Sequence, residues 1–212
     1  MSVKPIFFAL DGKHLDNFSR ELEILKGNIY GVKVGLEMFI SEGPSSVEKL
    51  KKDGWTVFLD LKLHDIPNTV QAAVISAGNI GADYLTIHIA SGKEALLAAK
   101  ESRPENLKLL GVSTALTSKA YSPEISQRVY EEFLLAKESK IDGVICPPSE
   151  LFKTKELFEL IVTPGIRLKN DDSHDQKNIT TPEKAIRDGA SYLVMGRSIR
   201  QNINYVVEKL KL

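Results

Sequence analysis

Residues 58–70 read F-L-D-L-K-L-H-D-I-P-N-T-V, and they begin as a buried strand before charged residues interrupt the apolar pattern. Successive side chains of a strand point to opposite faces. One face therefore carries leucines only: Leu59, Leu61 and Leu63. The other face carries Asp60 and Lys62, and Asp65 follows where the strand is expected to end. Two carboxylates thus bracket one ammonium group within a segment that is otherwise apolar.

Charged side chains in a buried strand are costly unless they are paired. Sequences break local rules in this way mainly where function requires it. The stretch therefore predicts a functional site. The alternative is an edge strand whose polar face is solvated and carries incidental ion pairs.

The composition of the 212 residues narrows the class of protein. Lys+Arg and Asp+Glu are equal at 28 each, so no basic excess points to a nucleic acid or a membrane surface. The single Cys146 excludes an internal disulfide and a cysteine-based zinc cluster, and it fits a reducing compartment. The sequence contains no signal-peptide core and no apolar run of about 18 residues. We expect a cytoplasmic protein that forms one domain over residues 1–212.

Short apolar runs alternate with longer amphipathic segments along the whole chain. The candidate strands are residues 6–10, 30–35, 56–61, 84–89, 107–112, 143–145, 160–162 and 192–195. Strands that alternate with helices imply a parallel sheet. Eight such units average roughly 26 residues each, which is near the lower limit for an α/β fold of the (β/α)8 TIM barrel type. A doubly wound open sheet is the alternative.

Three helix starts carry local signals. Asp16 is a candidate N-cap for a helix that ends at Gly27. Pro67 suits the first turn of a helix. Thr181 before Pro182 predicts a capped helix that runs toward Gly189.

Both candidate folds place chemistry at the carboxyl ends of the strands. The unusual polar residues of this chain fall at or just beyond these ends: Asp11, Lys33, Asp60, Lys62, Asp65, His88, Thr117, Arg167 and Arg197. A barrel would bring all of them to one mouth.

The segments after the seventh and eighth strands predict a phosphate site. Gly165 and Gly196 allow backbone N–H groups to approach an anion, and Arg167 and Arg197 can add forked hydrogen bonds. Either Gly–Arg pair alone is more often a turn with a solvated arginine. Their joint position after these two strands matches the usual phosphate site of barrels.

The segment 169–181 between these two pairs reads K-N-D-D-S-H-D-Q-K-N-I-T-T. Its length and polarity suit a lid that closes over a ligand. Gln176 is its best candidate for contacting an anion without adding charge.

At this point the chain resembles a known family. D-L-K-L-H-D-I-P-N-T at residues 60–69 is similar to the signature of the orotidine 5′-phosphate decarboxylases. Further matches follow in order: A-L-D at 9–11, K-V-G at 33–35, L-T-S at 116–118, T-P-G-I-R at 163–167, D-Q at 175–176 and M-G-R-S at 195–198. The resemblance covers essentially the whole chain, and it is strongest to the compact bacterial form.

The resemblance implies a (β/α)8 barrel and a homodimer whose active sites are shared across the interface. The implied reaction converts orotidine 5′-monophosphate to UMP and CO2, the last step of de novo UMP synthesis, with neither metal nor organic cofactor. Lys33, Asp60 and Lys62 would meet Asp65 of the partner subunit in an alternating charge network. Lys62 would deliver the proton to C6.

The resemblance also assigns contacts to the substrate. Asp11 and Lys33 would bind the ribose hydroxyls, and Thr69 would reach across the dimer. Thr117 and Ser118 would lie over the pyrimidine. The phosphate would be held by Arg167, Gln176, Gly196 and Arg197.

The residues themselves are consistent with this chemistry. No cofactor motif offers an electron sink for the carbanion that loss of CO2 leaves. Electrostatic stabilisation of the transition state remains. Asp60 would disfavour the substrate carboxylate beside it, and Lys62 would stabilise and protonate the carbanion.

Four further residues have ordinary interpretations. His64 is expected to make a structural hydrogen bond, and His88 to support the site without acid–base chemistry. Trp55 is expected to be a packing residue, and Cys146 a small core or loop residue.

Two other functions remain in competition. A keto-gulonate 6-phosphate decarboxylase shares D-x-K-x-x-D, but such enzymes use a metal and carry an acidic residue where Lys33 stands. Lys33 and the H-D-I-P-N-T continuation argue against it. A non-catalytic binder of phosphorylated ligands on the same barrel would have no need for the charge network.

Overall fold

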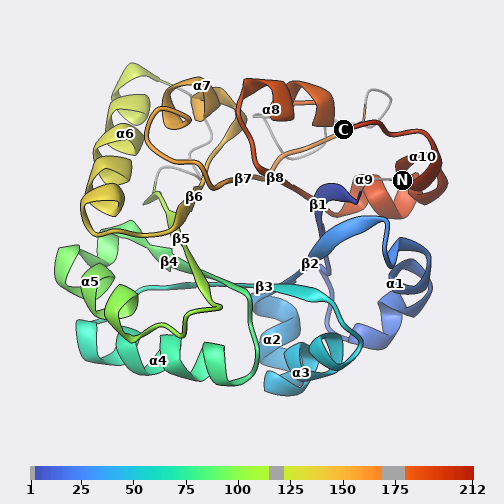
Figure 1. Cartoon of the computed structure of the whole chain (residues 1–212), viewed down its shortest axis with the longest axis horizontal. Helices are drawn as coiled ribbons and strands as arrows, with labels where there is room; N and C mark the ends of the chain where they lie inside the picture. The colour runs from blue at the N-terminus through green and yellow to red at the C-terminus, as the bar shows by residue number, and fades with distance from the viewer. Residues whose placement is uncertain (1–2, 115–121, 169–179) are drawn as a thin grey trace.

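Eight parallel strands close into a barrel in chain order (Figure 1). The computed structural model describes residues 3–114, 122–168 and 180–212. The strands are β1 (Lys4–Ala9), β2 (Ile29–Gly35), β3 (Thr56–Leu63), β4 (Tyr84–His88), β5 (Lys108–Val112), β6 (Gly143–Ile145), β7 (Ile161–Thr163) and β8 (Tyr192–Met195). Because β1 pairs with both β2 and β8, the sheet has no edge. The prediction of a (β/α)8 TIM barrel is confirmed, and the open-sheet alternative is wrong.

Helices surround the barrel in Figure 1. They are α1 (Ser19–Leu25), α2 (Leu36–Glu42), α3 (Pro44–Lys52), α4 (Pro67–Asn79), α5 (Lys93–Ser102), α6 (Pro123–Glu138), α7 (Leu151–Thr154), α8 (Pro182–Asp188), α9 (Arg197–Gln201) and α10 (Ile203–Glu208). Short 3-10 helices are η1 (Leu15–Phe18), η2 (Ile89–Ser91) and η4 (Pro148–Glu150). None of the helices in the described ranges is long and apolar enough to cross a membrane.

Two of the three predicted helix starts are confirmed. Pro67 opens α4. The Thr181 hydroxyl accepts a hydrogen bond from the N–H of Lys184, so Thr181 caps α8. The cap at Asp16 is wrong, because Asp16 lies inside η1 and α1 begins only at Ser19.

Alternate residues of each strand face two different cores. Phe8, Val57 and Leu59 belong to the large cluster between the strands and the helices. Seven other buried side chains fill the barrel itself: Phe7, Phe58, Tyr84, Leu110, Val112, Ile145 and Val162. Burial on both faces explains why the strands read as apolar runs in the sequence.

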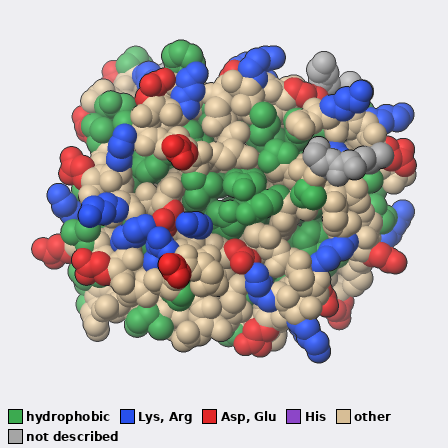
Figure 2. Space-filling view, in the orientation of Figure 1, with side chains coloured by type: hydrophobic (Ala, Val, Ile, Leu, Met, Phe, Trp, Pro, Cys, Tyr) green, Lys and Arg blue, Asp and Glu red, His purple; other side chains and the backbone are tan. Residues whose placement is uncertain are grey.

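Aromatic rings fill one end of the barrel. Phe7 lies 5.2–5.4 Å, between ring centroids, from Tyr30, Phe58, Tyr84 and Tyr192. Tyr84 and Tyr192 begin their strands, so these rings lie toward the amino ends. Figure 2 shows hydrophobic side chains at the centre of one end of the barrel, with charged side chains around them.

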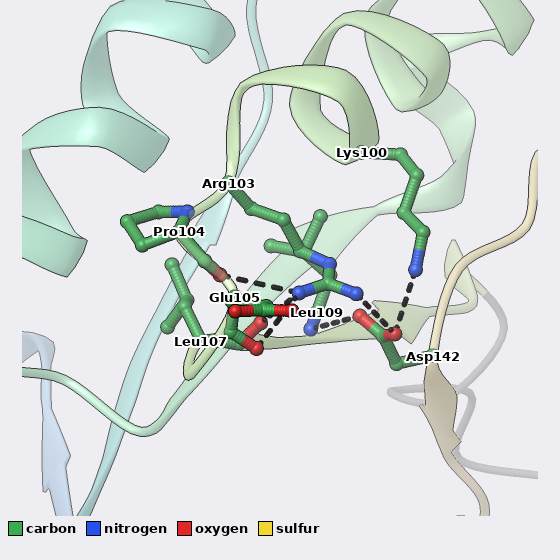
Figure 3. A network of polar contacts seen from close by, with 7 residues as sticks. All are labelled: Lys100, Arg103, Pro104, Glu105, Leu107, Leu109 and Asp142. Carbon is green, nitrogen blue, oxygen red and sulfur yellow. Dashed lines mark hydrogen bonds and ion pairs between the residues drawn. The ribbon is translucent and has the colours of Figure 1, made fainter.

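A polar network joins β5, β6 and the end of α5 at the amino ends of the strands (Figure 3). Asp142, directly before β6, accepts hydrogen bonds from Lys100 Nζ at 2.7 Å and Arg103 Nη2 at 3.0 Å. Its other oxygen accepts the N–H of Leu109 at 2.9 Å. One carboxylate therefore links the starts of β5 and β6 to the end of α5, the helix that precedes β5.

The same arrangement occurs at β3 and β4, two strands earlier in the chain. Asp83, directly before β4, pairs with Lys51 of α3 and accepts the N–H of Val57 at 2.7 Å. These two networks hold the amino ends of β3, β4, β5 and β6.

Candidate active site at the mouth of the barrel

The carboxyl ends of β1, β2 and β3 surround a pocket of about 270 Å³. Four predicted site residues line it: Asp11, Lys33, Asp60 and Lys62. Neighbouring strands of a parallel barrel end at the same mouth, so residues far apart in the sequence meet there. The pocket is completed by Leu10, Gly35, Leu36, Glu37 and Met38.

The four charged side chains alternate in sign across the pocket. Lys33 Nζ lies 3.4 Å from Asp11 Oδ1 and 3.6 Å from Asp60 Oδ2. Lys62 Nζ donates a hydrogen bond to Asp60 Oδ1 at 2.8 Å. The order is therefore carboxylate, ammonium, carboxylate, ammonium, and Asp60 pairs with both lysines.

The centre of this network is shielded from solvent, whereas its outer end is open. The side chains of Lys33 and Asp60 are 11% and 13% exposed, and that of Asp11 is 68% exposed. Burial alone would raise the pKa of Asp60, but the charges of Lys33 and Lys62, with hydrogen bonds from Lys62 and Thr86, outweigh it and hold that pKa below its usual value. Asp60 is therefore a carboxylate at neutral pH.

Lys62 has an unusual backbone. Its φ angle is +51°, in the left-handed region that costs a non-glycine residue on the order of 1–2 kcal/mol. The β3–β4 pairing is irregular here: Leu59 pairs with Leu85, and the next pair is Leu63 with Ile87. Residues 60–62 therefore form a bulge opposite a single residue of β4. Bulges of this kind re-aim side chains and are common beside active sites.

The residue opposite the bulge is Thr86, which sequence reasoning missed. Its side chain is buried, it accepts the N–H of Lys62 at 2.8 Å, and it donates to Asp60 Oδ1 at 3.0 Å. Threonine is an ordinary strand residue. The only sequence signal was its spacing of two from His88, which gives both side chains the same face of β4.

Asp65 and Thr69 do not join this network within the chain. Both side chains are exposed. Asp65 Oδ1 accepts the N–H of Ile66 at 2.7 Å, and within the described residues Lys62 is paired with Asp60 and not with Asp65. Within one chain Lys62 therefore pairs with Asp60 alone, and the expected contact with Asp65 of the partner subunit stays a prediction.

The predicted phosphate residues lie at the carboxyl ends of β7 and β8. Gly165 has a φ of +77°, and the N–H of Arg167 donates to the carbonyl of Thr180 at 3.0 Å. Gly196 lies directly after β8, and a Cβ atom there would come within 3.2 Å of Asp11 Oδ2. The exposed Arg197 begins α9. Because β8 is next to β1, this region borders the charge network.

Three predicted site residues lie outside the described residues: Thr117, Ser118 and Gln176. The same holds for residues 169–179, which form most of the expected lid.

The two histidines lie beside the network. His64 follows β3 and is exposed, and its ring lies 5.4 Å from that of His88 at the end of β4. Burial lowers the pKa of His88, and the charges of His64 and Lys62 act in the same direction. Within the described ranges, no three His, Cys, Asp or Glu side chains gather as metal ligands would. Trp55 and Cys146 are buried, as predicted.

A closed (β/α)8 barrel with an alternating lysine–aspartate network at the carboxyl ends of its strands has the architecture of a barrel enzyme. The chain belongs to the orotidine 5′-phosphate decarboxylase / HUMPS family, whose profile matches residues 4–210.

Named relatives are similar over nearly their whole length. An orotidine 5′-phosphate decarboxylase of Fusobacterium nucleatum is 41% identical, with 95% of this chain and 91% of the relative covered. One of Oenococcus oeni is 43% identical, with 93% and 92% covered. The crystal structure of orotidine 5′-phosphate decarboxylase from Lactobacillus acidophilus superposes with a TM-score of 0.78 at 33% identity and covers 93% of this chain and 92% of that one.

Proposed function

We propose that this chain decarboxylates orotidine 5′-monophosphate to UMP and CO2 in pyrimidine biosynthesis. The observation that carries the proposal is the network of Lys33, Asp60 and Lys62 in the mouth pocket of a chain from this family. Membership of the family supports the class of reaction, and the geometry supports the residues that perform it.

The proposed chemistry centres on Asp60 and Lys62. The bond from C6 to the carboxylate breaks, CO2 leaves, and the electron pair that remains on C6 takes a proton from Lys62 Nζ. Lys62 lies 2.8 Å from Asp60, so an ammonium and a carboxylate occupy neighbouring points of the pocket. The carboxylate disfavours the substrate anion, and the ammonium stabilises the developing carbanion, so both favour the transition state over the bound substrate.

We further propose how the rest of the substrate binds. Asp11 and Lys33 hold the ribose, and Thr117 and Ser118 contact the pyrimidine. Gly196, Arg167, Arg197 and Gln176 hold the phosphate. The proximity of Asp11 to Gly196 supports this order, because the ribose and the 5′-phosphate of a nucleotide are adjacent.

The proposed functional unit is a homodimer. Asp65 and Thr69 are exposed and contribute nothing to the pocket of their own chain, so they are available to the pocket of a partner. Large apolar side chains of α2 and of the β3–α4 connection are exposed as well: Leu36, Ile40 and Ile66. We propose that each chain acts as one domain over residues 1–212, in the cytoplasm, where its single buried thiol would stay reduced.

The rival functions predict different outcomes for one assay. Purified protein is incubated with orotidine 5′-monophosphate in excess EDTA, and the loss of its ultraviolet absorbance is followed. Decay to UMP is expected, and Lys62→Ala should abolish it while leaving the circular dichroism unchanged. Activity that needs a metal would favour the keto-gulonate type of enzyme. UMP binding without decay would favour the non-catalytic binder.

A further inference from the structure

We propose that Thr86 is a positioning residue for the decarboxylation, because its hydroxyl couples the backbone of Lys62 to the carboxylate of Asp60. The inference rests on the proposed function. It concerns a residue that does not line the mouth pocket and is 0% exposed.

The bulge in β3 creates the need for such a residue. Three consecutive residues, 60–62, lie opposite Thr86 alone, since Leu85 pairs with Leu59 and Ile87 with Leu63. The regular ladder therefore offers no backbone carbonyl to the N–H of Lys62. A backbone N–H away from water requires a partner. The Thr86 hydroxyl supplies it at 2.8 Å.

The hydrogen-bond inventory then fixes the direction of the Thr86 proton. A hydroxyl carries one proton and two acceptor lone pairs. One lone pair accepts the Lys62 N–H, and the proton goes to Asp60 Oδ1 at 3.0 Å. An ionised carboxylate can only accept. The same Asp60 oxygen accepts Lys62 Nζ at 2.8 Å, so the backbone of Lys62 is bonded to Thr86, its ammonium to Asp60, and these two partners to each other.

These hydrogen bonds fix the direction of the Lys62 side chain. The left-handed backbone of Lys62 is held in place by Thr86, and this backbone aims the side chain that carries the proton. Threonine is suited to the task because its branched Cβ restricts χ1 and keeps the hydroxyl in one direction. Loss of the hydroxyl would release both Asp60 and Lys62 while leaving the ribose and phosphate contacts intact.

The test compares variants of Thr86 in the full-length protein. Thr86→Val removes the hydroxyl at nearly constant volume. We expect kcat to fall by about 10- to 100-fold, because small misplacements of reacting groups have effects of this size. KM and the affinity for UMP should change by less than about threefold, since the loss concerns the transition state. Thr86→Ser keeps the hydroxyl and should restore most of kcat.

A matched control separates this role from the general cost of losing a buried hydroxyl. Thr154 of α7 is also buried and donates its hydroxyl to the carbonyl of Glu150 at 2.8 Å, outside the pocket. Thr154→Val should lower stability and leave kcat unchanged. Amide hydrogen exchange provides a second readout: the Lys62 N–H should lose protection in Thr86→Val and keep it in Thr86→Ser. If Thr86→Val does not fold, Thr86→Ala is measured in its place.

Each outcome has one meaning. Slow turnover in Thr86→Val with recovery in Thr86→Ser supports the proposal. A folded Thr86→Val enzyme with the kcat of the wild type overturns it and leaves the proposed function standing. A wild-type protein that does not decarboxylate orotidine 5′-monophosphate refutes the proposed function itself, and the role of Thr86 in that reaction with it.

Discussion

The carboxylate of Asp65 accepts a hydrogen bond from the N–H of Ile66 at 2.7 Å, at an exposed position just beyond Lys62 in the sequence. The side chain is thereby held at the start of the β3–α4 connection, outside the pocket that contains Lys62. A carboxylate that is exposed outside the pocket of its own chain is available to the proposed active site of a second subunit.

Mixing experiments test the shared site. Lys62→Ala and Asp65→Asn should each be inactive alone. When their subunits exchange, one of the two sites in a hybrid dimer carries neither lesion, so about a quarter of the wild-type activity should return. The assay is turnover of orotidine 5′-monophosphate after mixing.

The matched control uses two residues of the same chain. Lys62→Ala mixed with Asp60→Asn leaves a lesion in every site and should stay inactive. Subunit exchange between Lys62→Ala and Asp65→Asn is demonstrated separately. If the exchanged mixture then shows no turnover, the site lies within one chain.

Arg197 should act mainly through the phosphate. Arg197→Ala is expected to weaken UMP binding by about 10- to 100-fold, the usual effect of losing a charge-assisted hydrogen bond, without changing the affinity for uridine. Calorimetric titration with both ligands measures this. Arg200→Ala is the control, because Arg200 lies on the same short helix but pairs with Glu21. Equal losses for UMP and uridine would place Arg197 elsewhere.

The low pKa of Asp60 makes a prediction about acid stability. Because the pKa of Asp60 in the folded chain lies below its ordinary value of 3.8, the unfolded chain binds more protons near that pH. The stability that Asp60 contributes is therefore fully present above about pH 5 and is lost as the pH falls through the folded pKa.

Asp60→Asn should consequently lower the free energy of unfolding by about 3 kcal/mol at pH 7, because Lys33 and Lys62 lose their shared anion. This difference should shrink as the pH drops below about 4. Urea unfolding of both proteins between these pH values measures it. A difference that stays constant with pH would show that the Asp60 carboxylate gains nothing from its lysines.

Asp142 should affect stability without affecting catalysis. Asp142→Ala removes the acceptor for Lys100, Arg103 and the Leu109 N–H, so a loss of about 2–4 kcal/mol in unfolding free energy is expected. Its kcat should match the wild type, because Asp142 lies at the amino ends of the strands. Glu138→Ala, which removes an exposed pair with Lys93, should cost at most about 1 kcal/mol. A large change in kcat for Asp142→Ala would contradict the division of roles between the two ends.

The strands could be predicted because burial on both faces leaves a strong apolar signal, and Asp11, Lys33, Asp60 and Lys62 could be predicted because they interrupt it. The left-handed backbone of Lys62 and the role of Thr86 could not. Both depend on how β3 pairs with β4, which is a non-local property that no spacing within 58–70 contains. The sequence around a threonine in an apolar strand also does not indicate which groups its hydroxyl will hydrogen-bond.

Local signals failed at Asp16 for a related reason. A residue that can cap a helix also occurs inside short 3-10 helices. The chain forms such a helix, η1, up to Phe18, before α1 begins. Thr181 succeeded because a proline and an early acidic residue support the same start.

The side chains that fill the barrel limit the routes by which a ligand can enter or leave the charged pocket. Phe7, Phe58, Leu110 and Val162 are at most 1% exposed, so the described interior offers no tunnel behind the charged pocket. Under the proposed function, CO2 released at C6 would therefore leave by the same side of the pocket through which the nucleotide enters, while UMP still occupies the site.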